Sequence, residues 1–401
     1  MPHGGRPVAG MPTVAVVGGS LGGLTAALVL RDIGCDVTVY ERSSSALEAR
    51  GAGIAVLHET LRYPTERLGI PAERICSRTG WIRFLERDGT IGHEQRHGYL
   101  FSSWNTIYRT LLDAFDPGRY LLGREMTSFT SDVDGLTVRF ADGGQTRVDL
   151  LVCADGINSV ARAAMLPDAA PRYAGYVAWR GVVPEAALGP AAFDALHDAL
   201  TYQVLPGSHI LVYPIPGPDG AVEEGRRSMN MVWYRNVAAE DLAGLLTDRT
   251  GQRRSVSLPP GAAREEVVAQ MRELAEGCLA PAIGAVVAGV EEPFVQAVFD
   301  IDVSRMVSGR ACLIGDAAFD VRPHAAAGTA KAAEDGWVLA RHLEATGGDV
   351  PAALVAWEAE QLALGSALLA RTREIGDSSQ FTGGFRPGDE RLIFGLYGPG
   401  R

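Results

Sequence analysis

The 401-residue sequence has no uninterrupted apolar stretch of about 18 residues, the length that a membrane-spanning helix requires. Basic residues are also in deficit. The 37 lysines and arginines are outnumbered by 48 aspartates and glutamates, so the net charge is −11 at pH 7. Because nucleic acids and anionic membranes attract basic surfaces, neither is expected as a partner. The first ten residues lack the apolar segment of a signal peptide, so a cytoplasmic protein is expected.

Cysteine is scarce, and no two cysteines have CxxC spacing, which argues against a disulfide framework and against a structural zinc site. No metal site is predicted. We interpret the cysteines as small core residues of a protein in a reducing compartment. They are Cys35, Cys76, Cys153, Cys278 and Cys312.

The N-terminal part contains a strand, a glycine-rich turn, a helix and a second strand, which is the order of a βαβ unit. The run 13–17 is β-branched and apolar, 21–33 is rich in Ala and Leu, and 36–40 returns to β-type residues. Hydrophobic residues make up 47% of the chain, enough for a large core. The length predicts more than one domain, or one domain with a large insertion.

The turn of this unit has Gly18, Ser20 and Gly23 at the spacing of the GxGxxG fingerprint. Gly18 permits a tight turn and Gly23 permits close packing of helix on strand. The amides of the turn and of the helix that begins at Leu21 would cradle a pyrophosphate. Glu41 ends the second strand, where a carboxylate reaches ribose hydroxyls. A bare structural turn is the alternative, and this motif alone does not separate NAD from FAD.

A second motif, DGxxSxxR, begins at Asp155 and Gly156, directly after the predicted strand 148–154. Ser159 can cap the helix that Arg162 enters. A capped helix start with no ligand is the alternative interpretation.

A third motif places Gly315 and Asp316 at the end of the predicted strand 311–315. An aspartate there can accept a hydrogen bond from a ribityl or ribose hydroxyl. The small-residue stretch RPHAAAG ends at Gly328, within a predicted helix over 325–345. The N-terminus of this helix can point at a flavin phosphate or at the flavin O2 edge, where negative charge develops on reduction.

The middle of the chain has a different pattern. The segments 173–183, 202–214 and 228–236 are rich in Tyr, Val and Trp and are punctuated by Pro and Gly, which predicts antiparallel strands. The spacing over 264–274 predicts an amphipathic helix, and 352–376 predicts a C-terminal helix.

In this order and spacing, the three motifs resemble those of the single-component FAD-dependent aromatic hydroxylases, the para-hydroxybenzoate hydroxylase-like monooxygenases. The resemblance runs from Thr13 to about Ala345. It implies an α/β fold with a discontinuous, Rossmann-like FAD-binding domain, an inserted, mostly antiparallel β-sheet substrate domain and a C-terminal helix. The predicted divisions are 11–75, 98–170 and 303–345 for the FAD-binding domain, 76–97 and 171–302 for the substrate domain, and 346–401 for the C-terminal helix and tail.

The resemblance also implies roles for individual residues. The first turn and Glu41 would hold the ADP half of FAD, Asp155 and Gly156 are associated with both FAD and NAD(P)H, and Asp316 would contact the ribityl chain. Arg109 would reach the flavin from a helix and Arg42 would touch the nicotinamide donor, although a solvated surface arginine is the alternative for each. The loop that carries Pro323, Ala327 and Gly328 would lie against the isoalloxazine.

The implied reaction uses NAD(P)H and O2, and a flavin C4a-hydroperoxide hydroxylates an electron-rich aromatic ring. The sequence does not distinguish NADH from NADPH, and the assembly could be a homodimer. The stretches YAGYVAWRGVV, YPIPG and RPHAAAGTAKAAED resemble those family members that hydroxylate 2,6-dihydroxypyridine. Phe319 and Ala326 replace the histidine and the glycine that most relatives carry. A hydroxylated pyridine is therefore the predicted substrate. A phenol, a purine or a polyketide is the alternative, as is an FAD-binding redox protein without hydroxylation.

His324 and Tyr213 are the predicted catalytic residues. His324 lies in the loop expected to face the flavin, so it can hydrogen-bond a ring hydroxyl or accept its proton. A histidine packed into a turn is the alternative. Arg180 either positions the substrate or pairs with a carboxylate. The other candidates for the opposite wall of the site are Tyr202, His209, Trp233 and Tyr234, and each is as readily a core residue.

Overall fold

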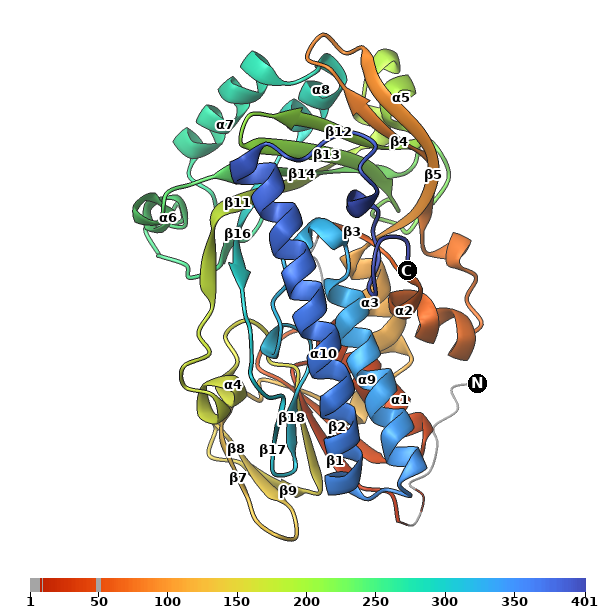
Figure 1. Cartoon of the computed structure of the whole chain (residues 1–401), viewed down its shortest axis with the longest axis vertical. Coiled ribbons are helices and arrows are strands. Elements are labelled where there is room, and N and C mark those ends of the chain that lie inside the picture. Colours follow the sequence, from red (N-terminus) through yellow and green to blue (C-terminus); the bar gives the residue numbers. More distant parts are fainter. Residues whose placement is uncertain (1–7, 9, 48–51) are drawn as a thin grey trace.

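The computed structural model describes residue 8, residues 10–47 and residues 52–401. Most of the first ten residues, where no signal peptide is expected, lie outside this part. The lower half of Figure 1 is built on a six-stranded sheet with the order β17–β18–β10–β1–β2–β6. Neighbouring strands are parallel except for the β17–β18 pair. The strands are β1 (Thr13–Val17), β2 (Asp36–Glu41), β6 (Tyr120–Leu122), β10 (Leu150–Cys153), β17 (Val307–Ser308) and β18 (Ala311–Leu313).

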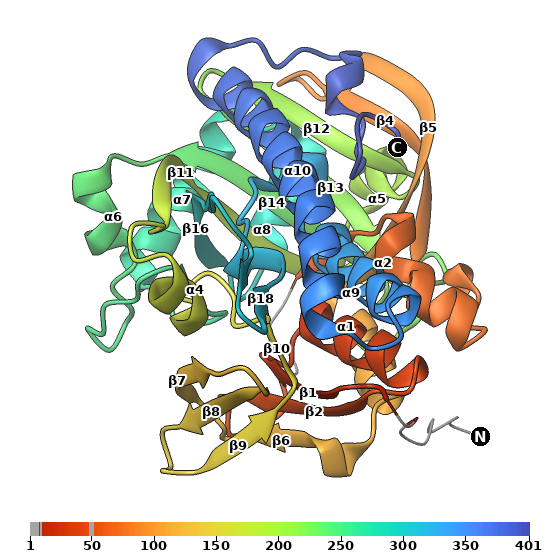
Figure 2. The ribbon, with the colours of Figure 1, turned by 60° about the horizontal axis from the view of Figure 1, so that its bottom comes forward.

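Three helices cover this sheet in successive layers: α1 (Leu21–Asp32), α9 (Gly328–Ala345) and α10 (Val350–Asp377). Two glycines explain why α1 and α9 approach so closely. A Cβ on Gly22 would lie 2.7 Å from the Cβ of Ala332, and a Cβ on Gly336 would lie 2.8 Å from the Cα of Ala26. The small sheet of β7 (Met126–Ser131), β8 (Leu136–Phe140) and β9 (Gln145–Val148) lies beside β1 and β2, at the lower left of Figure 2.

The upper half is a nine-stranded sheet with the order β15–β16–β11–β14–β13–β12–β4–β5–β3. It is antiparallel apart from the β4–β12 pair. Its strands are β3 (Gly53–Ala55), β4 (Ser77–Leu85), β5 (Ile91–Ser103), β11 (Arg172–Pro184), β12 (Ala199–Leu205), β13 (Ser208–Ile215), β14 (Ser228–Asn236), β15 (Ser257–Leu258) and β16 (Phe294–Asp300).

The two faces of this sheet are both buried but differ in composition. Along β14, Met231 and Trp233 pack into the core beneath α5 (Pro190–Leu196), α7 (Glu265–Cys278) and α8 (Pro281–Gly289). Val232 and Tyr234 face the other way, into a second cluster that is rich in tyrosine. Alternation along a strand produces this division, because successive side chains point to opposite faces.

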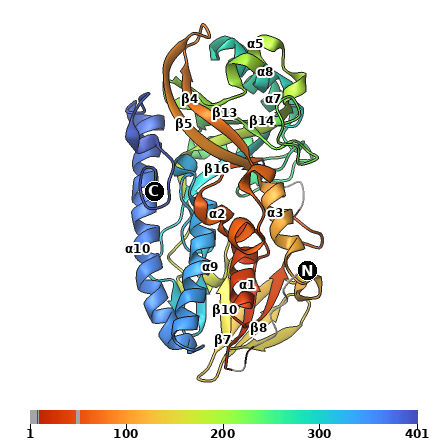
Figure 3. The ribbon, with the colours of Figure 1, turned by 90° about the vertical axis from the view of Figure 1, so that its right-hand side faces the viewer.

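The remaining helices are short connections: α2 (His58–Arg62), α3 (Trp104–Asp113), α4 (Val160–Met165) and α6 (Ala239–Leu245). The 28-residue helix α10 extends from the lower sheet to the upper one, and the tail that follows brings Phe385 and Phe394 into the tyrosine-rich cluster. Figure 3 shows α10 along one side of both halves. Among the described residues, no helix is long and apolar enough to cross a membrane.

The predicted elements are present, with differences in detail. The strand predicted over 148–154 is divided between the end of β9 and β10, and the strand predicted over 311–315 ends at Leu313. The segment 202–214 forms two strands, β12 and β13, which turn at Pro206 and Gly207, and the helix predicted over 325–345 begins only at Gly328. The division into domains stays a proposal. The strand β5 spans the proposed boundary at residue 98, and β3 pairs with β5 in the large sheet.

Candidate active site

Three loops meet at one edge of the six-stranded sheet. In the parallel register Val17 is paired with Cys153, and Cys153 with Leu313, so β1, β10 and β18 end side by side. The residues that follow these strands therefore lie together, although they are far apart in sequence. They are the three motifs that begin at Gly18, Asp155 and Gly315. Ligands of open α/β sheets bind at this carboxyl edge.

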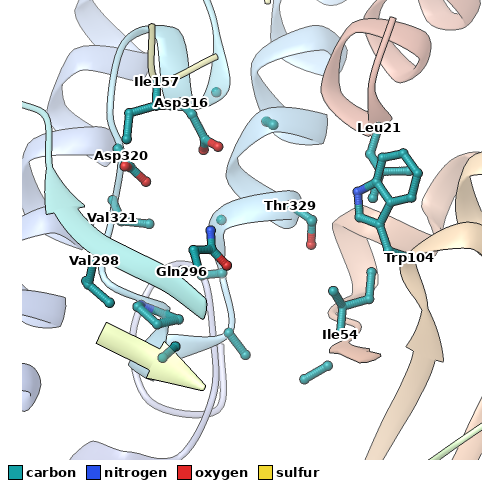
Figure 4. A pocket seen from close by; sticks show the side chains of 18 of the residues that line it. Leu21, Ile54, Trp104, Ile157, Gln296, Val298, Asp316, Asp320, Val321 and Thr329 are labelled. Atoms are coloured by element: carbon teal, nitrogen blue, oxygen red, sulfur yellow. The ribbon is translucent and has the colours of Figure 1, made fainter. Parts of the chain in front are cut away.

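A cavity of about 410 Å³ separates this edge from the tyrosine-rich face of the nine-stranded sheet. Figure 4 shows Asp316 and Asp320 on one side of it and Leu21, Thr329, Trp104 and Ile54 on the other. Predicted site residues that line it are Ser20, Leu21, Gly23, Gly156, Tyr213, Asp316, Pro323, Ala327 and Gly328.

The first turn has the geometry that its glycines predict. Gly18 has a φ of +102°, and a Cβ there would lie 2.2 Å from the carbonyl oxygen of Ala154. A Cβ on Gly23 would lie 1.9 Å from the carbonyl oxygen of Gly18. Ser20 precedes α1 without a capping bond from its side chain, so the first amides of the helix remain available to a ligand in the cavity.

Glu41 holds this turn in place from the end of β2. Its buried carboxylate accepts hydrogen bonds from the amides of Gly19 (2.9 Å) and Ser43 (2.8 Å). Arg42 and Arg109 are exposed. Glu41 and both arginines lie outside the set of described residues that line the cavity.

The second motif caps a helix and also braces the third motif. Asp155 accepts hydrogen bonds from the Ser159 hydroxyl (2.6 Å) and the Val160 amide (2.8 Å), and Ser159 in turn caps the Arg162 amide. The buried Arg162 guanidinium donates to the carbonyl oxygens of Ile157 and, at 3.1 Å, Ala317. It therefore ties the loop after β10 to the loop after β18.

Asp316 and Asp320 place two carboxylates in one wall of the cavity (Figure 4). The Asp316 side chain is exposed within the cavity. Desolvation by the protein that surrounds the cavity raises its pKa to about 6. Burial and the charge of Asp316 raise the pKa of Asp320 as well. Beneath them, Asp335 accepts the Gly315 amide at 2.9 Å and pairs with buried Lys331 at 2.5 Å, which fixes the start of the motif.

The raised pKa of Asp316 predicts a pH-dependent gain in stability for Asp316→Asn in the FAD-free protein. An aspartate with a pKa of about 6 in the folded state and about 3.9 in the unfolded state destabilises the fold as pH rises through that window. We expect the variant to be about 1 kcal/mol more stable at pH 7, after allowance for solvent screening of this exposed group, and equal to wild type near pH 4. Urea unfolding at the two pH values measures this. The same difference at both would contradict the account.

The RPHAAAG loop lines the large cavity with Pro323, Ala326, Ala327 and Gly328. Pro323–Ala325 make a single 3₁₀ turn, and Ala326 then adopts φ 53°, a left-handed conformation that favours glycine. This strain costs about 1 kcal/mol, and α9 begins two residues later. Buried Arg322 anchors the loop through Asp300 (3.0 Å) and Asp377 (2.6 Å).

The loop turns His324 away from the large cavity. Its ring lines an adjacent cavity of about 20 Å³, where Nε2 lies 2.7 Å from the Tyr176 hydroxyl. Burial, His209 and the Arg322 charge hold the pKa of His324 well below its usual value, so the ring is neutral. Tyr234 lines both cavities.

Tyr213 does line the large cavity. It stacks on Phe101 with ring centroids 4.1 Å apart, and its hydroxyl donates to the Gly53 carbonyl oxygen at 3.0 Å. Tyr202 and His209 line the small cavity, whereas Trp233 lies on the far face of the sheet in the outer core.

Sequence reasoning missed several lining residues. Asp320 follows Asp316 by four residues, so a second acid in GDAAFD was a usable signal. No sequence pattern marked Gln296 or Thr329 as a site residue, because a polar residue on a strand or in the first turn of a helix is usually solvated.

Comparison with known proteins agrees with this geometry. A model of the pyridine nucleotide-disulphide oxidoreductase family matches residues 13–61, and an FAD binding domain-like model matches residues 173–300. The 2,6-dihydroxypyridine 3-monooxygenase of Paenarthrobacter nicotinovorans is 38% identical over 389 residues, 96% of this chain and 95% of that protein. This chain belongs to the FAD-dependent aromatic monooxygenases.

Solved structures of FAD-dependent aromatic monooxygenases have the same fold. The 2,6-dihydroxypyridine-3-hydroxylase from Arthrobacter nicotinovorans matches with a TM-score of 0.91 and 36% identity over 98% of each chain. A variant of Klebsiella pneumoniae HpxO complexed with FAD matches with a TM-score of 0.77 and 25% identity, over 95% of this chain and 92% of that one. The predicted α/β fold, enzyme class and FAD cofactor are confirmed, and NAD(P)H and O2 are the co-substrates with an aromatic ring.

The residues present suit FAD. Two helix N-termini, those of α1 and α9, open onto one cavity. At Gly328 an added Cβ would meet only a methyl group of Val321 at 4.0 Å, so its backbone is open to a ligand. The carboxylate of Asp316 offers an acceptor for hydroxyl groups, and the apolar side chains of Leu21, Ile54 and Trp104 suit a flat ring.

Proposed function

We propose that this monooxygenase hydroxylates a hydroxylated pyridine such as 2,6-dihydroxypyridine. The observation that carries the proposal is its 38% identity, across almost the whole chain, to an enzyme named for that substrate. The cavity supports it. Its sheet side offers aromatic and small apolar walls with few polar groups, which fits one small ring.

We propose that the cavity is divided between cofactor and substrate. The ADP half of FAD is held by Gly18, Ser20, Leu21, Gly23 and Glu41. Asp155 and Gly156 serve both FAD and NAD(P)H, and Asp316 contacts the ribityl chain. Arg109 reaches the flavin, and Arg42 contacts the nicotinamide donor. Pro323, Ala327 and Gly328 lie against the flavin. Tyr213 helps form the ring-binding wall. FAD, when bound, supplies the electron transfer from NAD(P)H and the reaction with O2.

The chain's own contribution is binding, orientation and exclusion of water. Phe101, Leu211 and Val232 give the sheet side of the cavity a dry surface. The Tyr213 hydroxyl is engaged by Gly53, and burial raises its pKa to about 12, so it stays protonated. The hydroxyl therefore holds Gly53 in place and the ring shapes the wall of the cavity, and Tyr213 does not accept a proton at neutral pH.

Turnover across a substrate panel tests the proposal. The FAD-loaded enzyme is given hydroxylated pyridines, a phenol, salicylate and urate, and NADH or NADPH loss, O2 uptake and H2O2 are followed together. We expect a hydroxypyridine to stimulate NAD(P)H oxidation with little H2O2, whichever nicotinamide cofactor is preferred. Coupled turnover with another ring alone would favour that substrate, and yellow protein that never consumes NAD(P)H would favour a non-hydroxylating redox protein.

The variant His324→Ala tests the proposed role of this histidine in catalysis. The imidazole of His324 lines the small cavity behind the loop. Its effect on a ring bound in the large cavity is therefore transmitted through Tyr234, which lines both cavities, or through the position of the loop. We expect the variant to keep FAD but to release several times more H2O2 per NAD(P)H, because the loop is less well held. Unchanged product per NAD(P)H would mean that His324 only packs. Tyr173→Phe, which removes a hydroxyl bonded to Val237 away from both cavities, is the control.

We further propose that the enzyme is a cytoplasmic homodimer. All five cysteines are free, which suits a reducing compartment. Light scattering during size-exclusion chromatography measures the assembly, and a mass of one chain would contradict the dimer.

A further inference from the structure

Arg180 stands on β11 with its guanidinium in the wall of the large cavity. One terminal nitrogen donates to the Gly53 carbonyl oxygen at 2.7 Å and the other to the Gln296 side-chain oxygen at 3.3 Å. Its Nε is buried without a partner. The two hydrogen-bond acceptors of the guanidinium are thus uncharged, and its Nε has no acceptor.

No carboxylate pairs with Arg180 among the described residues. The buried Arg227 and Arg322 differ in this respect, because Arg227 is paired with Glu185 and Arg322 with Asp300. Arg180 is also the one lysine or arginine among the described residues that line this cavity. A cation in a partly dry site that lacks a protein counter-ion is complementary to an anionic ligand.

The groups that face Arg180 from the neighbouring strands carry no negative charge. Its positive charge lowers the pKa values of Tyr213 on β13 and Tyr234 on β14, although burial raises both more strongly. Gln296 on β16 and Gly53 on β3 contribute dipoles without charge. The two acids of the cavity, Asp316 and Asp320, belong to the wall formed by the loop after β18.

The histidines do not supply a competing charge. Burial lowers the pKa of His209 to about 3, and it also keeps His324 neutral. Because the pKa of each ring lies below neutral, each is a weak base and does not retain a proton taken from a ring hydroxyl. Arg180 is left as the group that decides which ionisation state of a ring is bound.

Resting on the proposed function, we propose that Arg180 is the counter-ion that selects the aromatic substrate as its hydroxyl-deprotonated anion. The ring O–H bond breaks before or during binding, the proton passes to bulk water, and the electron pair stays on the ring oxygen beside the guanidinium. Tyr234 adds a hydroxyl from β14, the strand that pairs with β11. Specificity then favours rings with acidic hydroxyl groups, whose anions are also the more electron-rich.

The test is a binding titration without turnover. FAD-loaded, oxidised enzyme is titrated under nitrogen, without NAD(P)H, with 2,6-dihydroxypyridine across the pH range in which its hydroxyl ionises. The flavin absorption change gives Kd, and the ultraviolet band of the ring reports the ionisation state of the bound ligand. For wild type we expect Kd to rise about tenfold for each pH unit below the ligand pKa and to be constant above it.

Arg180→Gln should abolish this slope, remove the anion band of the bound ring and weaken binding above the ligand pKa by about tenfold to a hundredfold. Arg180→Lys should keep the slope with weaker binding, because it retains the charge without the fork geometry. FAD affinity should be unchanged in both. The control is Arg235→Gln, which removes a cation of the adjacent strand that lies 5.2 Å over Trp233 on the far face of the sheet. It should leave Kd and slope as in wild type.

Two results would overturn the inference while leaving the proposed function intact: retention of the wild-type slope in Arg180→Gln, or loss of FAD from it, which would make Arg180 a cofactor ligand. Absence of any flavin change with wild type at every pH would contradict the proposed function, and this inference with it.

Discussion

Gly18→Ala is expected to lower FAD affinity about a hundredfold or more and to yield nearly colourless protein. The added methyl group would lie 2.2 Å from the Ala154 carbonyl oxygen, and the φ of +102° is one that an L side chain rarely adopts. Overpacking and backbone strain each cost about 1–3 kcal/mol, so the turn must move and its amides leave the position that suits a phosphate. Flavin fluorescence titration of the FAD-free protein measures the loss.

A glycine of another helix provides the control for Gly18→Ala. Gly277 lies in α7, where an added Cβ meets nothing within 4 Å. Gly277→Ala should keep FAD affinity and leave stability equal or slightly higher, because alanine favours the helix. Full flavin content in Gly18→Ala at low FAD would remove this turn from the cofactor site.

Arg227→Met is expected to lower the free energy of unfolding by about 3–5 kcal/mol, because it leaves a buried charge without its partner. Glu185 has no exposed side-chain surface, and Arg227 donates to it from Nε at 3.0 Å and from Nη2 at 2.6 Å. Urea denaturation monitored by far-ultraviolet circular dichroism measures the change.

Two further variants make this test specific. Arg147→Met removes an exposed ion pair with Asp132 and should lower the stability far less than Arg227→Met does, because water screens the exposed charges. The double variant Glu185→Gln with Arg227→Met should recover part of the loss, since no buried charge remains. An equal decrease in the free energy of unfolding for Arg147→Met and Arg227→Met would show that the buried pair stabilises the fold no more than the exposed pair does.

The parts of the fold that follow from local pattern were predictable from the sequence. β14 begins and ends at the predicted residues 228 and 236, and its centre is the β-type run Val232–Trp233–Tyr234. The meeting of three distant motifs was also accessible, because parallel strands end at one edge of a sheet. The capping role of Ser159 needed only its position before a helix.

What depends on tertiary packing was not accessible. Whether His324 points toward or away from the large cavity is decided by the 3₁₀ turn, by the left-handed Ala326 and by the bond to Tyr176. The choice between the two interpretations of Arg180 required the register of the large sheet, which brings Gly53 and Gln296 to the guanidinium in place of an acid. Spacing along the chain carries neither kind of information.

The most direct test of the central claim is turnover of 2,6-dihydroxypyridine under ¹⁸O2 with the FAD-loaded enzyme, followed by mass spectrometry of the product. A monooxygenase that hydroxylates this ring should give product with one ¹⁸O atom, in a one-to-one ratio to the NAD(P)H consumed. Product without ¹⁸O, or NAD(P)H consumption balanced entirely by H2O2 across all hydroxypyridines, would contradict it.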